Sequence, residues 1–446
     1  MCFVPSGWSQ QGAGLSRRTF LGTGLAGAVS ATVFGASRLA GAQTLPRQAA
    51  SGSSGVVALT GATVYPGPDV PLIQRGVVVV RDGRILAVGS QGEVVIPGDA
   101  RILDCSGLSV TAGFSNCHVH FMERKWQDAE HAPASHLTDA LAAMLTRYGF
   151  VRVVDTGSFL PNTRAIGRRL DRGDVAGPQI ITAGSGFAPA AGSPYYVQPA
   201  RVPELTDPGT ARALVTELLD ADGDLVKLFT GSWATQTSIV VMPVDIVRAA
   251  TSTAHQRGKL VVAHPSNGAG ARAALDGGVD ILAHTFPSEL TGPWDRSLPL
   301  RIREAGMALI PTLKLWKYEA RRLGVPAARA EAARVNSAAQ LKAFADAGGQ
   351  LLFGTDVGYM ADYDPTDEYL LMQQAGLTFW QVLASLTTGP AARFARAAHS
   401  GRIVAGMDAD LVVLDGNPER DISALARVRY AVRLGRVVYD GKPATG

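Results

Sequence analysis

The sequence of 446 residues predicts an α/β protein, in which a (β/α)8 TIM barrel carries a small composite β-sandwich domain built from the N- and C-terminal segments. Three observations predict this fold. Between residues 111 and 400, short apolar runs alternate eight times with helix-length stretches. Both flanks, 56–110 and 401–446, are instead rich in short strand-like runs separated by Gly, Pro and Asp-Gly. Because chain termini commonly lie close together, the two flanks can complete one domain.

The first 55 residues have the features of an export signal and a linker. Arg17 and Arg18 precede a weakly apolar, Gly/Ala-rich stretch that ends at the small residues Ala40-Gly41-Ala42. This pattern predicts a twin-arginine signal peptide over 1–42, a flexible linker over 43–55, and therefore a periplasmic or secreted protein. The apolar run is interrupted and shorter than the ~20 residues that span a bilayer, so no stable membrane insertion is expected.

The charge of the chain argues against a nucleic-acid partner, and its cysteine content allows at most one disulfide outside the predicted signal. The formal net charge is +4, and three of these charges come from Arg17, Arg18 and Arg38 in the predicted signal, which has no acidic residue. No basic patch remains to indicate nucleic-acid binding. Beyond the signal the chain has two cysteines, Cys105 and Cys117, which are expected to be either a buried pair or, in an oxidising compartment, a disulfide.

The barrel prediction rests on eight candidate strands in chain order. They occupy residues 113–121, 151–158, 179–185, 224–231, 259–267, 280–286, 307–314 and 350–358. Intervening stretches such as 207–223 and 242–258 begin with helix-start signals and end at Gly. A doubly wound open sheet is the alternative architecture, but no Gly-rich dinucleotide loop follows the first strand.

Residues that suit metal binding fall in or at the ends of these strands. Strand alternation places His118 and His120, two residues apart, on the same face of the first strand. Because the carboxyl ends of barrel strands form the active site, the sequence predicts convergence of His118, His120, Lys227, His264, His284 and Asp356. Imidazoles and a carboxylate suit Zn²⁺ or a similar divalent metal. Burial would lower the pKa of Lys227, and a neutral amine can react with CO₂ to give a carbamate that bridges two metals.

The strand-end segments carry a resemblance to a known family. VTAGFSNCHVHF, VKLFTG, VVAHP, ILAHTF and FGTDVG resemble, in order, the metal-binding motifs of the amidohydrolase superfamily. The flanks LTGATVYPG and GRIVAGMDADLVVLDGNP resemble its composite β-domain, so the resemblance covers residues 56–442. YGFVRVVDTGS and AGPQIITAGS are most similar to the imidazolonepropionase-like and Xaa-Pro dipeptidase-like branch.

This resemblance implies a binuclear metal site. Two divalent metal ions, expected to be zinc, would be held by His118, His120, His264, His284 and Asp356, with carbamylated Lys227 as the bridging ligand. A metal-bridging hydroxide would attack an amide carbonyl, and Asp356 would act as general base and then as general acid. The expected activity is hydrolysis of a C–N bond in a small amide or peptide substrate, such as a dipeptide or N-acyl amino acid.

Several alternatives remain open. The same site could hydrolyse a cyclic amide, as imidazolonepropionase does, or a lactone or ester, and it could hold one metal instead of two. A non-catalytic binding protein is the alternative outside enzymes, although no predicted ligand is missing. The sequence also leaves open whether the chain forms a homo-oligomer.

The substrate-binding residues are not fixed by the sequence. Loop aromatics that could line the pocket are Tyr195, Tyr196, Trp233, Trp294, Trp316, Tyr359 and Tyr363. Arg124 and Lys125 could bind a substrate carboxylate or lie on a solvated rim. Asp155 could orient a metal ligand or serve only as a structural strand-end residue.

Overall fold

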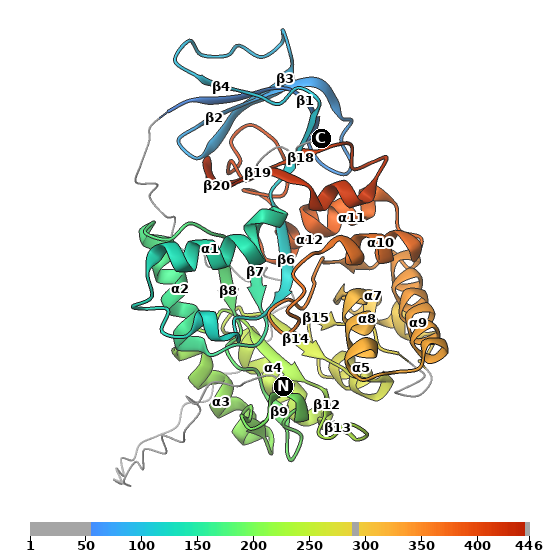
Figure 1. Cartoon of the computed structure of the whole chain (residues 1–446). Helices are drawn as coiled ribbons and strands as arrows, with labels where there is room; N and C mark the ends of the chain where they lie inside the picture. The colour runs from blue at the N-terminus through green and yellow to red at the C-terminus, as the bar shows by residue number, and fades with distance from the viewer. Residues whose placement is uncertain (1–54, 288–293, 442–446) are drawn as a thin grey trace, which may run out of the picture.

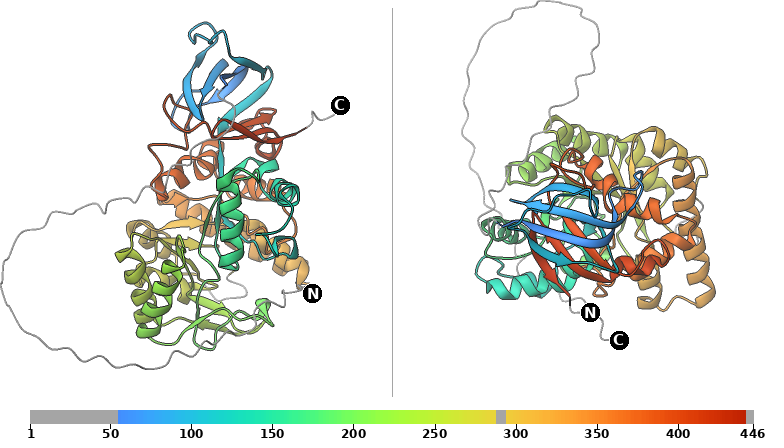
Figure 2. Two further views of the ribbon diagram at one scale, coloured as in Figure 1. Left: turned by 90° about the vertical axis from the view of Figure 1, so that its left-hand side faces the viewer. Right: turned by 90° about the horizontal axis from the view of Figure 1, so that it is seen from above.

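A computed structural model of the chain describes residues 55–287 and 294–441. The predicted signal, 1–42, and all but the last residue of the predicted linker lie outside this range. The described chain forms a barrel surrounded by helices, with strands from both ends of the chain lying side by side at one end of the molecule (Figures 1 and 2).

The terminal strands form one eight-stranded sheet. Its order is β20-β19-β18-β5-β1-β2-β3, and β4 pairs separately with β1. The strands are β1 Val57–Tyr65, β2 Ile73–Arg81, β3 Arg84–Ser90, β4 Arg101–Asp104, β5 Leu108–Ala112, β18 Leu411–Asp415, β19 Val428–Arg433 and β20 Arg436–Asp440. The antiparallel pairing of β18 with β5 joins the two ends of the chain, as expected. These strands form one continuous sheet, so the β-sandwich that the sequence predicts for this domain stays a prediction.

The barrel consists of eight parallel strands. They are β6 Phe114–Val119, β7 Phe150–Asp155, β8 Gln179–Thr182, β11 Val226–Phe229, β14 Val261–His264, β15 Ile281–Ala283, β16 Ala308–Ile310 and β17 Gln350–Leu351. They form two sheets, β6-β7-β8 and β11-β14-β15-β16-β17. Backbone hydrogen bonds close both gaps between the sheets: Asp224 N donates to Thr182 O at 2.8 Å, and Cys117 N donates to Phe353 O at 2.7 Å. This closed parallel ring excludes the doubly wound open sheet.

All eight barrel strands are shorter than the sequence predicted, and for two of them the backbone shows where the strand is interrupted. The predicted strand 307–314 ends at Ile310, because Thr312 adopts a left-handed conformation with φ 46° and a helix begins at Leu313. The predicted strand 350–358 forms a ladder only over Gln350–Leu351, and Asp356 has φ 62°. Apolar runs extend beyond both strands, so periodicity alone overestimated their length.

Helices surround the barrel. They are α1 Ala134–Met144, α2 Leu160–Arg172, α3 Pro208–Asp220, α4 Val244–Gln256, α5 Gly268–Asp276, α7 Leu298–Glu304, α8 Leu313–Arg322, α9 Ala327–Asp346, α10 Thr366–Gln374, α11 Phe379–Leu386 and α12 Thr388–Arg393. The start of α3 shows why its sequence is helical: Asp207 Oδ1 accepts from Gly209 N at 2.7 Å, and Pro208 occupies the first turn. No helix in the described ranges is long and apolar enough to cross a bilayer.

Short elements lie in the loops that follow the barrel strands. They are the 3₁₀ helices η1 Arg124–Trp126 and η3 Tyr195–Val197 and the strands β9 Ala188–Pro189, β10 Glu204–Leu205, β12 Gly231–Trp233 and β13 Ile239–Val241. Two other 3₁₀ helices, η2 Thr146–Tyr148 before β7 and η4 Ile422–Ala426 after β18, contact the terminal sheet instead. Because β6 leaves the terminal sheet directly after β5, the barrel strands point away from that sheet. Their carboxyl ends therefore face the opposite end of the molecule.

The barrel and the terminal sheet meet through buried charges. Arg152 at the start of β7 lies 2.5 Å from Asp410 and 3.6 Å from Asp408, next to β18. Cys105 belongs to the core of the terminal sheet and Cys117 to the barrel interior, and both are buried free thiols. Of the two expectations for the cysteines, the disulfide is therefore wrong; the thiols are buried but lie in separate cores.

Candidate metal centre

The six residues singled out from the sequence lie around one cavity at the carboxyl ends of the barrel strands. The cavity has a volume of about 1100 Å³, and its lining includes His118, His120, Lys227, His264, His284 and Asp356. Five of these residues are buried, and the His120 side chain is 12% exposed. The predicted convergence is thus present in the structure, and the assignment of these residues as ligands is taken up below.

Asp356 is the centre of the tightest group. Its Oδ1 lies 2.8 Å from His120 Nε2 and 3.5 Å from His118 Nε2. Ligand atoms of these three residues all lie within 4.8 Å of one another, a spacing at which they could hold one metal ion. His284 Nε2 lies 4.0 Å from the other carboxylate oxygen, Oδ2. Asp356 therefore lies between the first-strand pair of histidines and His284.

A backbone carbonyl orients the His120 ring. His120 Nδ1 lies 2.7 Å from Gly157 O, which can only accept, so Nδ1 is assigned as the protonated nitrogen. In the neutral ring, Nε2 then has a lone pair that faces the Asp356 carboxylate. Two electron-pair donors at 2.8 Å need a shared proton or a cation between them, and this donor set fits a divalent metal.

Asp155 acts on this site through the same turn. It accepts hydrogen bonds from Gly157 N at 3.1 Å, Ser158 Oγ at 2.5 Å and Thr182 Oγ1 at 2.6 Å. Burial raises the pKa of Asp155 above its usual value, and the hydrogen bonds of Ser158 and Thr182 partly oppose this shift. Asp155 thus holds the turn that orients His120, without bonding to a histidine itself.

The four histidine rings form a continuous row. Ring centroids are 5.2 Å apart for His120 and His118, 4.6 Å for His118 and His284, and 4.6 Å for His284 and His264. Burial, reinforced by neighbouring Lys227 and histidine charges, lowers the pKa of His118, His264 and His284 well below the ordinary value. His264 Nε2 and His118 Nδ1 are buried without a hydrogen-bond partner. Neutral imidazoles with free nitrogens are the form in which histidine binds metal.

Lys227 is a buried amine on the inner face of the barrel. It lies on β11, is 2% exposed, and its Nζ lies 5.5 Å from the centre of the Phe229 ring. Burial lowers the pKa of Lys227 to about 8, and the nearby Asp356 and Asp155 carboxylates partly oppose this shift. A substantial neutral fraction is therefore available near neutral pH, as carbamate formation requires.

The backbone around the site adopts conformations that non-glycine residues rarely accept. His284 has φ 72°, Asp356 has φ 62° and Thr312 has φ 46°, each shortly after a barrel strand. Gly358, in the GTDVG segment, is required for close approach, because a Cβ there would lie 1.8 Å from the His120 carbonyl oxygen. The segment that follows β17 can therefore pass directly beside the first-strand histidines.

Five of the seven predicted pocket aromatics line the large cavity: Tyr195, Tyr196, Trp233, Trp316 and Tyr359. Tyr363 does not; its hydroxyl instead joins Lys125 and Glu123. The sequence leaves two alternatives for Arg124 and Lys125, carboxylate binding or a solvated rim. Arg124 lines the cavity, whereas Lys125 does not and its Nζ forms an ion pair with Glu123 at 2.9 Å. The position of Lys125 therefore fits the rim alternative.

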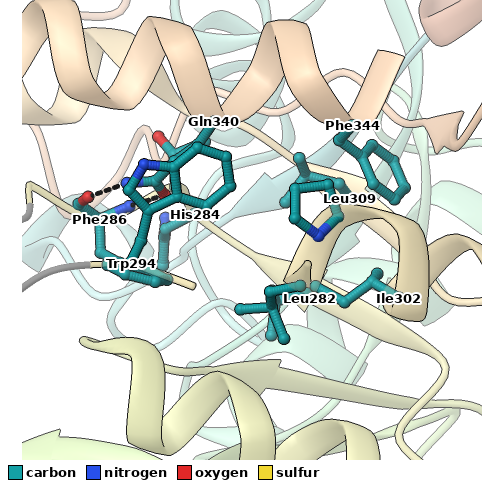
Figure 3. Close-up of a pocket in the computed structure, with 11 residues that line it drawn as sticks. Leu282, His284, Phe286, Trp294, Ile302, Leu309, Gln340 and Phe344 are labelled. Carbon is teal, nitrogen blue, oxygen red and sulfur yellow. Dashed lines mark hydrogen bonds between the residues drawn. The ribbon is translucent and has the colours of Figure 1, made fainter. Parts of the chain in front are cut away.

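Trp294 lines a different, small cavity behind His284. This space, of about 30 Å³, is enclosed by apolar side chains that include Leu282, Phe344 and Leu309 (Figure 3). Beside it, Gln340 Oε1 accepts from Phe286 N at 3.1 Å and Gln340 Nε2 donates to Phe286 O at 2.5 Å (Figure 3). A volume of this size holds only one or two water molecules, so it is not a substrate pocket.

Sequence reasoning missed several residues that position the site. Thr312 lies 2.6 Å from His284 Nδ1, and Gly157 holds His120. Asn116 bonds to Thr355 Oγ1 at 2.7 Å and to the backbone of His118 at 3.2 Å, which links β6 to the segment before Asp356. Thr312 and Gly157 both follow barrel strands, so the strand-end rule that identified the histidines could have identified them too.

Comparisons with known proteins agree with this geometry. A sequence model of the amidohydrolase family matches residues 109–442. The imidazolonepropionase of a Bradyrhizobium species is 40% identical over 63 residues, 14% of this chain and 16% of that enzyme. Three such matches to relatives with a named activity each span 21% of the relative's length or less.

Two solved structures share the fold over most of their length. A proposed prolidase from Bifidobacterium longum superposes with a TM-score of 0.74 at 25% identity, covering 88% of this chain and 97% of that one. A Xaa-Pro dipeptidase with methionine bound in its active site gives a TM-score of 0.74 at 20% identity, covering 86% of this chain and 100% of that one. The family match confirms the amidohydrolase resemblance that the sequence motifs indicated, and the two superpositions show that the fold is shared.

Proposed function

Because the chain belongs to the amidohydrolase family, we propose that it is a metal-dependent hydrolase that cleaves the C–N bond of a small amide or dipeptide. The observation that carries the proposal is the convergence of four histidines, a carboxylate and a buried amine on one cavity wall. A retained scaffold without catalysis would be expected to have lost at least one of these groups, and all six are present.

The donors divide into two overlapping sets that fit two ions. His118 and His120, with Asp356, would hold the first ion, and His264 and His284 the second, with Lys227 as a carbamate between them. Zinc is the expected metal, because neutral imidazoles and a carboxylate are its usual ligands outside thiolate sites. When bound, the metal supplies a Lewis acid for the amide carbonyl and lowers the pKa of a water molecule toward ~7.

The side chains around the site would handle protons and the carbonyl oxygen. Asp356 has both carboxylate oxygens near histidine nitrogens, so it can take a proton from the attacking water and deliver it to the leaving nitrogen. Tyr196 is a candidate donor to the carbonyl oxygen: burial raises its pKa, Asp356 is the charge that acts on it most, and its hydroxyl bonds to no other described residue. Its ring is held edge-on by Tyr195 and Tyr359, at 5.5 and 5.6 Å.

The cavity favours a substrate with a bulky apolar or aromatic group. Nine Phe, Tyr and Trp side chains line it, together with aliphatic residues such as Leu315, Leu323 and Val325. Arg124 at the same cavity could bind a substrate carboxylate. N-acyl amino acids and dipeptides combine these features. A cyclic amide is the second candidate, favoured by the sequence match to imidazolonepropionase.

Metal analysis combined with a substrate panel tests this proposal. Purified protein should contain up to two zinc ions per chain and hydrolyse at least one of N-acyl amino acids, dipeptides or cyclic amides. Carboxyl-blocked analogues of an active substrate should react more slowly if Arg124 binds the carboxylate. Turnover of lactones or esters alone, with every amide inert, would contradict C–N hydrolysis.

Export and domain organisation are proposed from the sequence. Residues 1–42 would direct the folded protein across the membrane, 111–400 would form the hydrolase barrel, and 56–110 with 401–446 would form the composite β-domain. Replacing Arg17 and Arg18 with Lys should retain the chain inside the cell; unchanged export would contradict a twin-arginine signal.

A further inference from the structure

His284 depends on a single hydroxyl for its orientation. Its Nδ1 lies 2.6 Å from Thr312 Oγ1, and the same Oγ1 lies 2.9 Å from Pro311 O. A hydroxyl has one proton, and the 2.9 Å contact uses that proton on the Pro311 carbonyl, which can only accept. In this arrangement Thr312 Oγ1 accepts from His284 Nδ1–H, and the Nε2 lone pair is directed toward Asp356.

Thr312 is held in an unfavourable conformation to make this contact. It is β-branched, fully buried, and has φ 46° and ψ 51°, the left-handed region that such residues avoid. It immediately precedes α8, and its own side chain does not cap that helix. We therefore attribute the conformation of Thr312 to the contacts that hold the first turn of α8 in place.

Glu368 fixes that first turn from another element. It lies on α10, is fully buried, and accepts from Leu313 N at 2.9 Å and from Lys314 N at 2.7 Å. These are two of the backbone groups that a helix start leaves unpaired, so a carboxylate 55 residues away in the sequence caps α8. Burial raises the pKa of Glu368 to about 7, so the carboxylate is retained here at a cost to folding.

Lys314 makes the reciprocal connection. Its Nζ donates to Asp364 O at 2.5 Å and Asp362 O at 3.1 Å, and lies 3.0 Å from Asp362 Oδ2. These groups belong to the segment between Asp356 and α10, while Lys314 itself is 3% exposed. Two sets of contacts thus join the start of α8 to the chain that follows Asp356: Glu368 accepts from the backbone of α8, and Lys314 of α8 donates to the backbone of Asp362 and Asp364.

We propose that Glu368 and Lys314 are positioning residues that, through the first turn of α8 and Thr312, hold His284 in the Nδ1–H tautomer with Nε2 directed at the metal centre. Neither Glu368 nor Lys314 lines the cavity, and neither contacts a predicted ligand. The proposal rests on the proposed function only where it assigns Nε2 to a metal. The tautomer itself is set by contacts within the protein and does not require a bound metal.

The test reads the tautomer directly in metal-free protein. Protein labelled with ¹⁵N-histidine should give, for His284, the pattern of an Nδ1–H ring, assigned by its loss in His284→Gln. Thr312→Val should convert this pattern to a mixture of tautomers, and Thr312→Ser should restore it. Glu368→Gln should shift it in the same direction, and Thr251→Val, which removes a buried hydroxyl bonded to Gly277 O at 2.7 Å away from the site, should leave it unchanged.

Metal binding gives the second readout. Titration against a zinc chelator should show a 10- to 100-fold loss of zinc affinity for one ion in Thr312→Val, the range found when an outer partner of a metal-binding histidine is removed. An Nε2–H tautomer in the wild type, or a wild-type tautomer and zinc affinity in both Thr312→Val and Glu368→Gln, would overturn the proposal. A wild type that binds no zinc but has the Nδ1–H tautomer would instead overturn the proposed function alone.

Discussion

Replacing Glu368 with Gln should remove a pH-dependent cost of folding. In the folded protein burial raises the pKa of Glu368 from its ordinary 4.5 to about 7; Lys314 and the two amides of α8 oppose this shift, and Asp367 reinforces it. As pH rises from 4.5 to 7, the unfolded chain gives up this proton while the folded chain keeps it. Stability contributed by this group is therefore complete below pH 4.5 and is lost as pH approaches 7.

The size of the effect follows from the difference between the pKa of Glu368 in the unfolded chain, 4.5, and in the folded protein, about 7. At 1.36 kcal/mol per unit, the side chain loses about 3 kcal/mol of stability between pH 4 and pH 8. Urea unfolding of the metal-free wild type and of Glu368→Gln should be measured at both pH values. The wild-type free energy of unfolding minus that of the variant should fall by about 3 kcal/mol, since the difference cancels all other titrating groups.

Glu331→Gln is the matched control. Glu331 lies on the surface in an ion pair with Arg334, and its pKa is lowered by that hydrogen bond, so its pH dependence should be small and of opposite sign. If the difference between wild type and Glu368→Gln were the same at pH 4 and pH 8, the carboxylate would not be strained by burial and the reasoning would be refuted.

Three further predictions concern the reaction. Asp356→Asn should reduce kcat at least ~100-fold on any active amide while circular dichroism stays unchanged; near-normal turnover would remove Asp356 from proton transfer. Lys227→Ala should lose zinc, measured by elemental analysis, and recover part of its activity when acetate or another short carboxylic acid is added. The same activity with and without the added acid would argue against a bridging carbamate. Tyr196→Phe should lower kcat on the order of 100-fold with little change in KM or melting temperature; an effect on KM alone would make Tyr196 a binding residue only.

The barrel and the six candidate ligands could be predicted from sequence because both follow from short-range patterns. Apolar runs mark the strands, and the carboxyl ends of all strands in a parallel barrel lie at the same end of the barrel. His118, Lys227, His264 and Asp356 therefore fall around one cavity although they are spread over more than half of the chain.

The contacts that orient those ligands could not be predicted in the same way. Glu368 lies in an ordinary helical sequence, and its role arises only because α10 passes the start of α8. The left-handed Thr312 follows from tertiary packing, since a β-branched residue has no local preference for that conformation. Likewise Trp294 and Tyr363 were expected at the pocket, but an aromatic residue in a loop does not reveal which cavity it will fill.

Metal dependence of amide hydrolysis tests the central claim most directly. The protein should be stripped of metal with a chelator, assayed on the N-acyl amino acid or dipeptide that turns over fastest, and titrated with Zn²⁺. Activity should fall to background after stripping and return as zinc binds, reaching its maximum at no more than two ions per chain. Full amide hydrolysis by protein that elemental analysis shows to be free of metal would contradict the account.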